Sequence, residues 1–280
     1  MKNLLTAVCA VLCLALFSCQ KEVDDIFANN GNNNNNNTGL LIKSIVKDGT
    51  DSSITTYTYN NANKLVGINT VQTSSGTTSI VNQTIVRNSQ GIIQKIIAKS
   101  PDLAQYGLDS LVSFVNYNTG TGHYTNRVFK LTIAGITALS DSIAYTYDGS
   151  GKIVTMADYS KDATGSTTAG KFDFTYTGAN MTTLKVYDLS SGSPVLTLTE
   201  VFDYDTKPSP LILGNEAYIL NRSEQWFSAN NIVKQTVNLV GDPVTHLINY
   251  NNTYNTFNKP ATINYISDGQ PAGTATYYYN

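Results

Sequence analysis

The segment Tyr57-Thr58-Tyr59-Asn60-Asn61-Ala62-Asn63-Lys64-Leu65 recurs in the same register as Tyr145-Thr146-Tyr147-Asp148-Gly149-Ser150-Gly151-Lys152-Ile153. Because side chains alternate along a strand, Tyr-x-Tyr places two rings on one face. Asn, Asp and Gly tolerate the left-handed conformations that a tight turn requires. The Lys and the aliphatic residue then begin a return strand. The motif therefore predicts a strand, a tight turn and a second strand.

Copies of this motif run through the chain at a spacing near 28 residues. The second ring of each copy falls at positions 59, 117, 147, 176, 204, 227, 254 and 279, and Arg87 replaces it in one copy. The shortest step follows residue 204, where the Pro-rich stretch 206–214 disturbs the pattern. Looser turns such as Ser74-Ser75-Gly76 and Ser267-Asp268-Gly269 alternate with the tight ones. Each repeat is thus one hairpin unit.

The repeat count predicts an all-β fold. Nine copies at two strands each give about 16–18 antiparallel strands, arranged as consecutive hairpins. A twisted sheet rarely exceeds about 10 strands without curling, so we expect one large curled or barrel-like sheet. Closed at this strand number, it would be too wide for side chains alone to fill. The composition agrees, since only 14% of residues are charged and 18 are tyrosine.

Residues 1–18 are typical of a lipoprotein signal peptide. Lys2 supplies the positive start, and the apolar run from Leu4 to Phe17 is shorter than the roughly 20 residues of a spanning helix. The sequence Leu16-Phe17-Ser18-Cys19 resembles the bacterial lipobox, which implies cleavage before Cys19 and lipidation of its thiol. The alternative is an ordinary cleaved signal with a chance Cys. The three cysteines all lie at positions 9–19, so residues 40–280 contain no disulfide.

Residues 19–39 are expected to form a disordered tether behind the lipidated Cys19. Six consecutive Asn, residues 32–37, cannot contribute to a packed core. Four charged residues precede them, and they resemble the acidic export signal of Bacteroidota surface lipoproteins: Lys21, Glu22, Asp24 and Asp25. That resemblance implies the outer face of the outer membrane, and the alternative is a plain polar tether. The folded domain is expected to span residues 40–280.

The repeat unit itself carries a family resemblance. Tyr-x-Tyr-Asn/Asp-x-x-Gly/Asn-Lys-Leu/Ile looks like the YD-type repeat of Rhs-like shells. With the lipobox and the Tyr-x-Tyr ending, the chain is similar to a Bacteroidota lipoprotein family of unknown function described as having a porin-like fold. The resemblance covers about residues 40–280, with departures at Arg87 and at 206–214. It implies no activity, so it transfers no functional residues to this chain.

The chemistry-bearing residues form no recognisable catalytic or metal motif. His123 and His246 have neither a second His nor an acid at metal-ligand spacing, so we expect no metal and no cofactor. Glu200, Asp203 and Asp205 lie on one predicted strand, whereas a glycosidase needs two carboxylates across a cleft. Solvated strand or turn positions are the simpler interpretation. A net charge of -2 gives no basic field for nucleic acid.

Two sets of residues are candidate surface sites. Tyr218, Trp226 and Phe227 could form an aromatic platform for a glycan or a protein ligand, although a core role is the simpler interpretation. Ser110 and Ser142 lie in Asp-Ser-Leu and Asp-Ser-Ile, which fit the short O-glycosylation motif of Bacteroidota.

Three functions are compatible with these features. The first is a surface-exposed, outer-membrane-anchored lipoprotein that acts as a non-catalytic binding or interaction module, held to the membrane through Cys19. The second is a membrane-spanning β-barrel or pore. Thr, Ser and Asn lie on both faces of the strands, as in 53–58, whereas a lipid-facing band needs apolar alternation. The third is a carbohydrate-active hydrolase.

Overall fold

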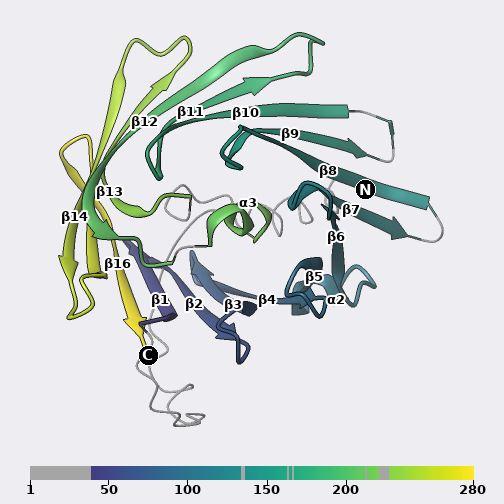
Figure 1. Cartoon of the computed structure of the whole chain (residues 1–280), viewed down its shortest axis with the longest axis horizontal. Helices are drawn as coiled ribbons and strands as arrows, with labels where there is room; N and C mark the ends of the chain where they lie inside the picture. Colours follow the sequence, from purple (N-terminus) through teal and green to yellow (C-terminus); the bar gives the residue numbers. More distant parts are fainter. Residues whose placement is uncertain (1–38, 134–135, 163, 166, 212, 221–226) are drawn as a thin grey trace.

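The computed structural model describes residues 39–133, 136–162, 164–165, 167–211, 213–220 and 227–280. In these residues the chain forms 16 antiparallel strands that close into one barrel, in which each strand pairs with its neighbours in sequence (Figure 1). The prediction of an all-β fold of consecutive hairpins in one large sheet is confirmed. Cys19, its lipobox, the export signal and Trp226 lie outside the described residues.

The strands follow each other around the barrel without a crossover. Their bounds are β1 Leu41–Asp48, β2 Asp51–Tyr59, β3 Leu65–Ser74, β4 Thr77–Arg87, β5 Ile93–Lys99, β6 Leu111–Asn118, β7 His123–Ile133, β8 Ile136–Tyr147, β9 Ile153–Asp162, β10 Thr167–Thr177, β11 Asn180–Asp188, β12 Val195–Pro208, β13 Asn230–Leu239, β14 Thr245–Tyr254, β15 Pro260–Ser267 and β16 Gln270–Tyr279. Within the described residues, three short helical elements interrupt them: α2 Pro101–Ala104, the 3₁₀ turn η1 Gly214–Glu216 and α3 Ala217–Leu220. No helix among the described residues is long and apolar enough to cross a membrane.

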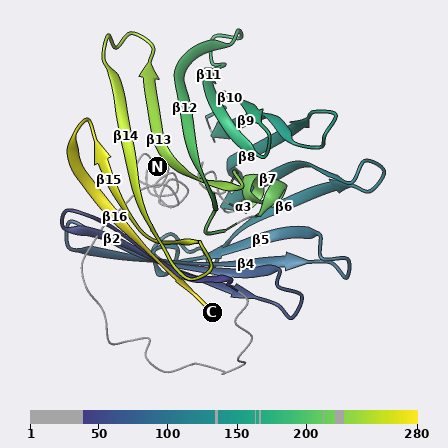
Figure 2. The ribbon, with the colours of Figure 1, turned by 60° about the vertical axis from the view of Figure 1, so that its left-hand side comes forward.

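The two ends of the described chain meet where the barrel closes. β16 pairs with β1, with Ser44 opposite Tyr277 and Val46 opposite Ala275. The Gly39 amide donates to the Asn280 carbonyl at 2.9 Å. Both ends therefore lie at the end of the barrel that carries the Tyr-x-Tyr turns, which we call the tight-turn end. The hairpin tips at the other end, the loose-turn end, spread outward (Figure 2).

The turn residues of the motif are explained by the geometry of the tight turns. The side chain of Asp148 accepts hydrogen bonds from the amides of Ser150 and Lys152, at 2.9 and 3.0 Å. Asn60, Asn88 and Asn255 accept two amide bonds each in the equivalent turns. Gly151 has φ +81°, in the left-handed region that favours glycine. The fourth motif position thus caps the turn, and the seventh makes the reversal possible.

In five loose-turn hairpins, the second tyrosine of the motif closes the open end. The Tyr147 hydroxyl donates to the carbonyl of Tyr124, the second residue of β7, at 2.7 Å. The same bond recurs from Tyr59 to Leu41, from Tyr176 to Ile153, from Tyr204 to Met181 and from Tyr279 to Pro260. Burial raises the pKa of the Tyr59, Tyr147, Tyr176 and Tyr279 hydroxyls, so they stay protonated donors. The repeat therefore encodes a hydroxyl bond that recurs between the two strands of these hairpins, which we call the clamp.

The barrel wall has an apolar inner face and a polar outer face. Inward residues such as Ile68, Ile85 and Phe202 are buried in a single core. The alternate residues face outward, where Asn and Thr side chains bond across neighbouring strands: Asn69 with Asn82, Thr73 with Thr78, Asn116 with Asn126 and Thr253 with Thr262. The first tyrosine, as in Tyr57, contributes to the inner face, where its hydroxyl bonds Ser44. The alternation thus puts the core inside the barrel.

One of the nine predicted copies of the motif, the copy at Phe227, is wrong. The ring of Phe227 does not end a strand, because residues 209–229 form a long connection between β12 and β13. The remaining eight copies supply eight even-numbered strands, and eight hairpins account for the 16 strands. The disturbed stretch 206–214 leads into this connection, whose course determines what fills the barrel.

Candidate functional site

The connection between β12 and β13 enters the barrel and packs against its inner wall (Figure 1). We call its described residues, 209–211, 213–220 and 227–229, the internal segment. All four residues of α3 are buried, and Ser209 and Ser228 are buried at the entrance and exit. A short helical turn can be buried in this way only if the surrounding wall satisfies its polar groups. The contacts of its backbone and of Glu216 show how this is done.

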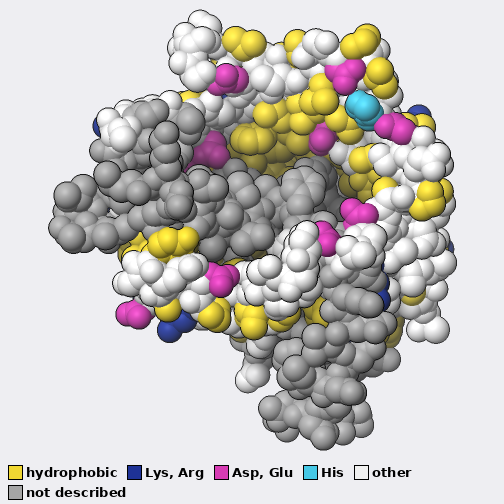
Figure 3. All heavy atoms as spheres, turned by 180° about the vertical axis from the view of Figure 1, so that it is seen from behind, with side chains coloured by type: hydrophobic (Ala, Val, Ile, Leu, Met, Phe, Trp, Pro, Cys, Tyr) yellow, Lys and Arg dark blue, Asp and Glu magenta, His cyan; other side chains and the backbone are white. Residues whose placement is uncertain are grey.

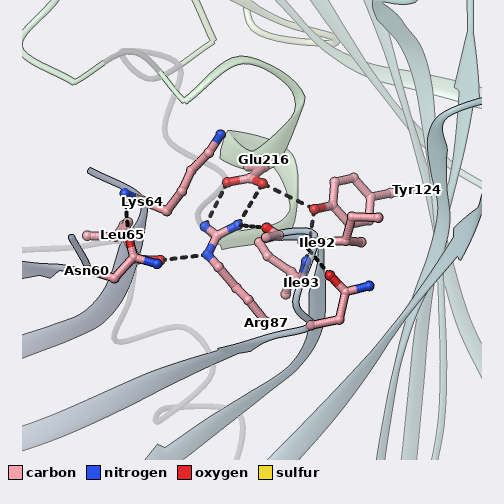
Figure 4. Close-up of polar contacts among 10 residues, drawn as sticks. Asn60, Lys64, Leu65, Arg87, Ile92, Ile93, Tyr124 and Glu216 are labelled. Atoms are coloured by element: carbon pink, nitrogen blue, oxygen red, sulfur yellow. Dashed lines mark hydrogen bonds and ion pairs between the residues drawn. The ribbon is translucent and has the colours of Figure 1, made fainter. Parts of the chain in front are cut away.

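A bidentate ion pair holds the internal segment to the wall (Figure 4). The guanidinium of Arg87, at the end of β4, contacts both carboxylate oxygens of Glu216 at 2.8 Å. The Tyr124 hydroxyl donates to the same carboxylate at 3.1 Å. The side chains of Arg87 and Glu216 are only 5% and 17% exposed, so water screens the pair weakly. Burial raises the pKa of Tyr124, and the adjacent Glu216 carboxylate raises it further.

Arg87 also performs the task of the tyrosine that it replaces. Its Nε donates to the Leu65 carbonyl at 3.0 Å, which is the bond that tyrosine hydroxyls make in other repeats. Its Nη1 donates to the Gly91 carbonyl at 2.7 Å as well as to Glu216. A tyrosine has one hydroxyl, whereas a guanidinium has five N–H donors in a planar fork. Arg87 can therefore close its hairpin and bind the internal segment at the same time.

Further hydrogen bonds fix the backbone of the internal segment to separate strands. Arg127 donates to the Ile219 carbonyl at 2.9 Å, and the Asn215 side chain donates to the Gly151 carbonyl at 2.8 Å. At the exit, the Ser228 hydroxyl accepts from the Met181 amide at 3.0 Å. These contacts reach β7, the β8–β9 turn and β11. The internal segment is thus tied to much of the circumference.

The predicted aromatic platform is mostly core. The rings of Tyr218 and Phe227 stack with centroids 4.1 Å apart, and the edge of Phe174 packs against both. Tyr218 is 2% exposed and Phe227 is 9% exposed, so neither ring presents an open face to a ligand. The simpler interpretation, a core role, fits these two residues. The sequence left the surface platform open as an alternative because the spacing gave no sign that the chain turns inward.

The predicted carboxylate set is divided between surfaces. Glu200 lies opposite Leu184 and Val237 on the inner face of β12, whereas Asp203 pairs outward with Lys234 at 3.8 Å. Asp205 accepts bonds from Asn231 and Lys207 at the tight-turn end. Glu200 and Asp203 therefore do not face one another across a cleft.

The two histidines have contacts that sequence spacing did not reveal. His123 stacks on Tyr147, with centroids 4.2 Å apart, at the start of β7. His246 lies 2.7 Å from Asp268 and 3.4 Å from Asp242. Those carboxylates raise the pKa of His246. Within the described residues, no group of three or more His, Cys, Asp or Glu could hold a metal ion.

The predicted glycosylation sites lie on different parts of the wall. Ser110 is half-buried just before β6, and Ser142 is half-buried on β8, opposite Val128 and Tyr159. Their modification stays a prediction.

Two solved structures are similar to this chain. A porin-like protein from Bacteroides uniformis ATCC 8492 superposes with a TM-score of 0.53 at 12% identity, covering 85% of this chain and 95% of the other. A porin-like protein from Bacteroides vulgatus ATCC 8482 gives a TM-score of 0.42 at 12% identity, covering 86% and 98%. No known family profile matches the sequence. No curated protein matches it either. The likeness to the first structure shows a porin-like fold.

Proposed function

We propose that this chain is a lipid-anchored protein of the outer membrane, exposed at the cell surface, that binds a ligand at the loose-turn end of its barrel and performs no catalysis. One observation carries the proposal. The internal segment occupies the barrel near the tight-turn end and is tied to the wall by the Arg87–Glu216 pair and by Arg127. A barrel occupied in this way is suited to be a one-sided receptacle rather than an open channel.

The outer wall supports the same proposal. Cross-strand pairs of Asn and Thr lie on it, and Lys43, Lys171 and Lys234 project from it beside Tyr278, Tyr187 and Asp203. A barrel wall that contacts lipid instead carries an outward apolar band about 25 Å tall between aromatic girdles. Charged residues at mid-bilayer depth cost roughly 2–4 kcal/mol each in such barrels. The wall is therefore suited to water, with a lipid on Cys19 supplying the attachment.

The closed 16-stranded barrel itself favours a second candidate, a membrane-spanning pore. Conductance across planar lipid bilayers separates the two. We expect the purified chain to give no stepwise conductance, even in the Arg87→Met, Glu216→Met double variant, in which the internal segment loses its ion pair. Channels that open in the double variant alone would make the chain a gated pore, and channels in the native chain would overturn the proposal outright.

The anchor is tested separately in cells. Cys19→Ala should abolish acyl labelling and release the protein from the membrane fraction. Replacing Lys21, Glu22, Asp24 and Asp25 by Ala should keep labelling but protect the domain from protease added to whole cells. Labelling that survives Cys19→Ala would refute the anchor, and unchanged proteolysis in the second variant would refute the export signal.

A further inference from the structure

Four apolar side chains are exposed together at the loose-turn end. We call them the rim patch: Val195 is 51% exposed, Leu239 45%, Val240 64% and Val244 54%. They lie at the tips of two neighbouring hairpins, β11–β12 and β13–β14, which are joined by pairing between β12 and β13. The hydrophobic effect favours covering such side chains, and clustered apolar residues on a surface mark interaction sites.

The rim patch is held in a fixed shape by hydrogen bonds. The Val240 amide donates to the Thr197 carbonyl at 2.9 Å, which joins the two hairpins. The Val244 amide donates to the Asp242 carboxylate at 2.8 Å, and the Leu247 amide donates to Asp268 at 2.7 Å. A preformed surface loses little conformational entropy when it binds.

The charge around the rim patch has one sign. The turns that form and flank it, 188–195, 239–246 and 266–270, contain three Asp and no Lys or Arg. Hydrogen bonds from Ser190, Val244 and His246 hold the pKa of Asp188, Asp242 and Asp268, respectively, below the ordinary value. Within these three turns, His246, between two of these carboxylates, is the one side chain that can add positive charge. Figure 3 shows hydrophobic and acidic side chains around the hollow of the barrel, with Lys and Arg at the edge of the view.

The rim patch lies far from the closure of the barrel. Gly39 bonds Asn280 at the tight-turn end, and β12, with 14 residues, extends about 45 Å between the two ends. A lipid on Cys19 would attach to the part of the chain that precedes Gly39, and therefore to the tight-turn end rather than to the rim patch. This step rests on the proposed anchor.

We propose that the rim patch docks a partner protein through a segment that is both apolar and positively charged. Apolar side chains of the partner would cover the four rim residues, and its Lys or Arg side chains would face Asp188, Asp242 and Asp268. A second copy of this chain fits less well, because a symmetric contact would bring the same three carboxylates together.

Panning a phage-displayed library of random peptides against the purified full chain tests the docking surface. We expect enriched peptides to combine aromatic or aliphatic residues with Lys or Arg. Their affinity should fall at least 10-fold in the Val240→Ser, Val244→Ser variant, and should fall with added salt and in Asp242→Asn. Val201→Ser is the matched control, because Val201 is 41% exposed on the outer wall and should leave the affinity unchanged. Thermal unfolding shows that each variant is folded.

Several results would contradict the proposed docking surface. Failure to enrich any peptide, enrichment of acidic peptides, or equal binding to the rim variant and the native chain would each overturn the docking surface. Dimers in analytical ultracentrifugation that disappear in the rim variant would assign the surface to a second copy. None of these results affects the bilayer and acyl-labelling tests, so the docking surface can fail while the anchored module stands.

Discussion

The hairpin that ends in Tyr147 and the hairpin that ends in Arg87 close the same strand gap with different chemistry. Tyr147 gives one hydroxyl bond to the Tyr124 carbonyl and stacks on His123, and both partners lie at the start of the neighbouring strand β7. Arg87 gives the equivalent bond to Leu65 and uses its remaining donors to hold Glu216, 129 residues further along the chain. The regular repeat builds the wall through local contacts. The altered repeat also makes a long-range contact, through Arg87, and this contact holds the internal segment inside the barrel.

The largest expected effect comes from breaking that long-range contact. Glu216→Met leaves the Arg87 guanidinium buried without its partner, so we expect a loss of about 3–5 kcal/mol in the free energy of unfolding. The Arg87→Met, Glu216→Met double variant buries no charge and should lose less than Glu216→Met alone. Urea unfolding followed by circular dichroism measures both. The Arg87→Met single variant completes the comparison. If the double variant loses as much stability as Arg87→Met and Glu216→Met together, the two residues act independently.

This contact also marks the limit of prediction from sequence. Alternating tyrosines, turn residues and their spacing predict hairpins because those interactions are local. Two departures from the repeat, Arg87 and 206–214, were visible in the sequence. Arg87 is one side of the contact, and 206–214 leads into the segment that carries Glu216, the other side. Their pairing could not be derived, since no local pattern links residues so far apart. The inward course of Tyr218 and Phe227 and the approach of Asp268 to His246 escaped prediction for the same reason.

Alkaline pH should lower the free energy of unfolding, because tyrosine hydroxyls are buried on the inner face of the wall. Burial raises the pKa of Tyr57 to about 12 from its ordinary value of 10.0. In the unfolded chain this phenol ionises first, so its contribution to stability is complete below pH 10 and is lost as the pH rises toward 12. Two pKa units correspond to at most about 3 kcal/mol from this residue. Unfolding at pH 9 and pH 11.5 measures the loss, and Tyr57→Phe should make it smaller. An equal loss in Tyr57→Phe would assign the alkaline effect to other groups.

Two Tyr→Phe substitutions compare a hydroxyl that makes a clamp bond, on Tyr147, with a hydroxyl buried in the core, on Tyr218. Tyr147→Phe removes the donor to the Tyr124 carbonyl and should lower the free energy of unfolding by about 1 kcal/mol. Tyr218→Phe keeps the stacking on Phe227 and removes a buried hydroxyl that has no hydrogen-bond partner among the described residues. It should therefore leave stability unchanged or raise it slightly. Chemical unfolding of the two variants side by side provides the measurement, and a larger loss in Tyr218→Phe would reverse this ordering.

The smallest expected effect concerns the turn position that Gly and Asn share. Gly91 has φ +80° and open space where a Cβ would lie, and Asn63 and Asn258 have φ +56° and +57° at the equivalent positions. Gly91→Asn should therefore change the free energy of unfolding by less than about 0.5 kcal/mol, because Asn tolerates this conformation. Gly91→Val should cost about 1–2 kcal/mol, since a β-branched residue is strained there. Equal unfolding midpoints for the two variants would show that the turn next to Arg87 rearranges freely, so that the ion pair, rather than the turn, fixes the position of the Arg87 side chain.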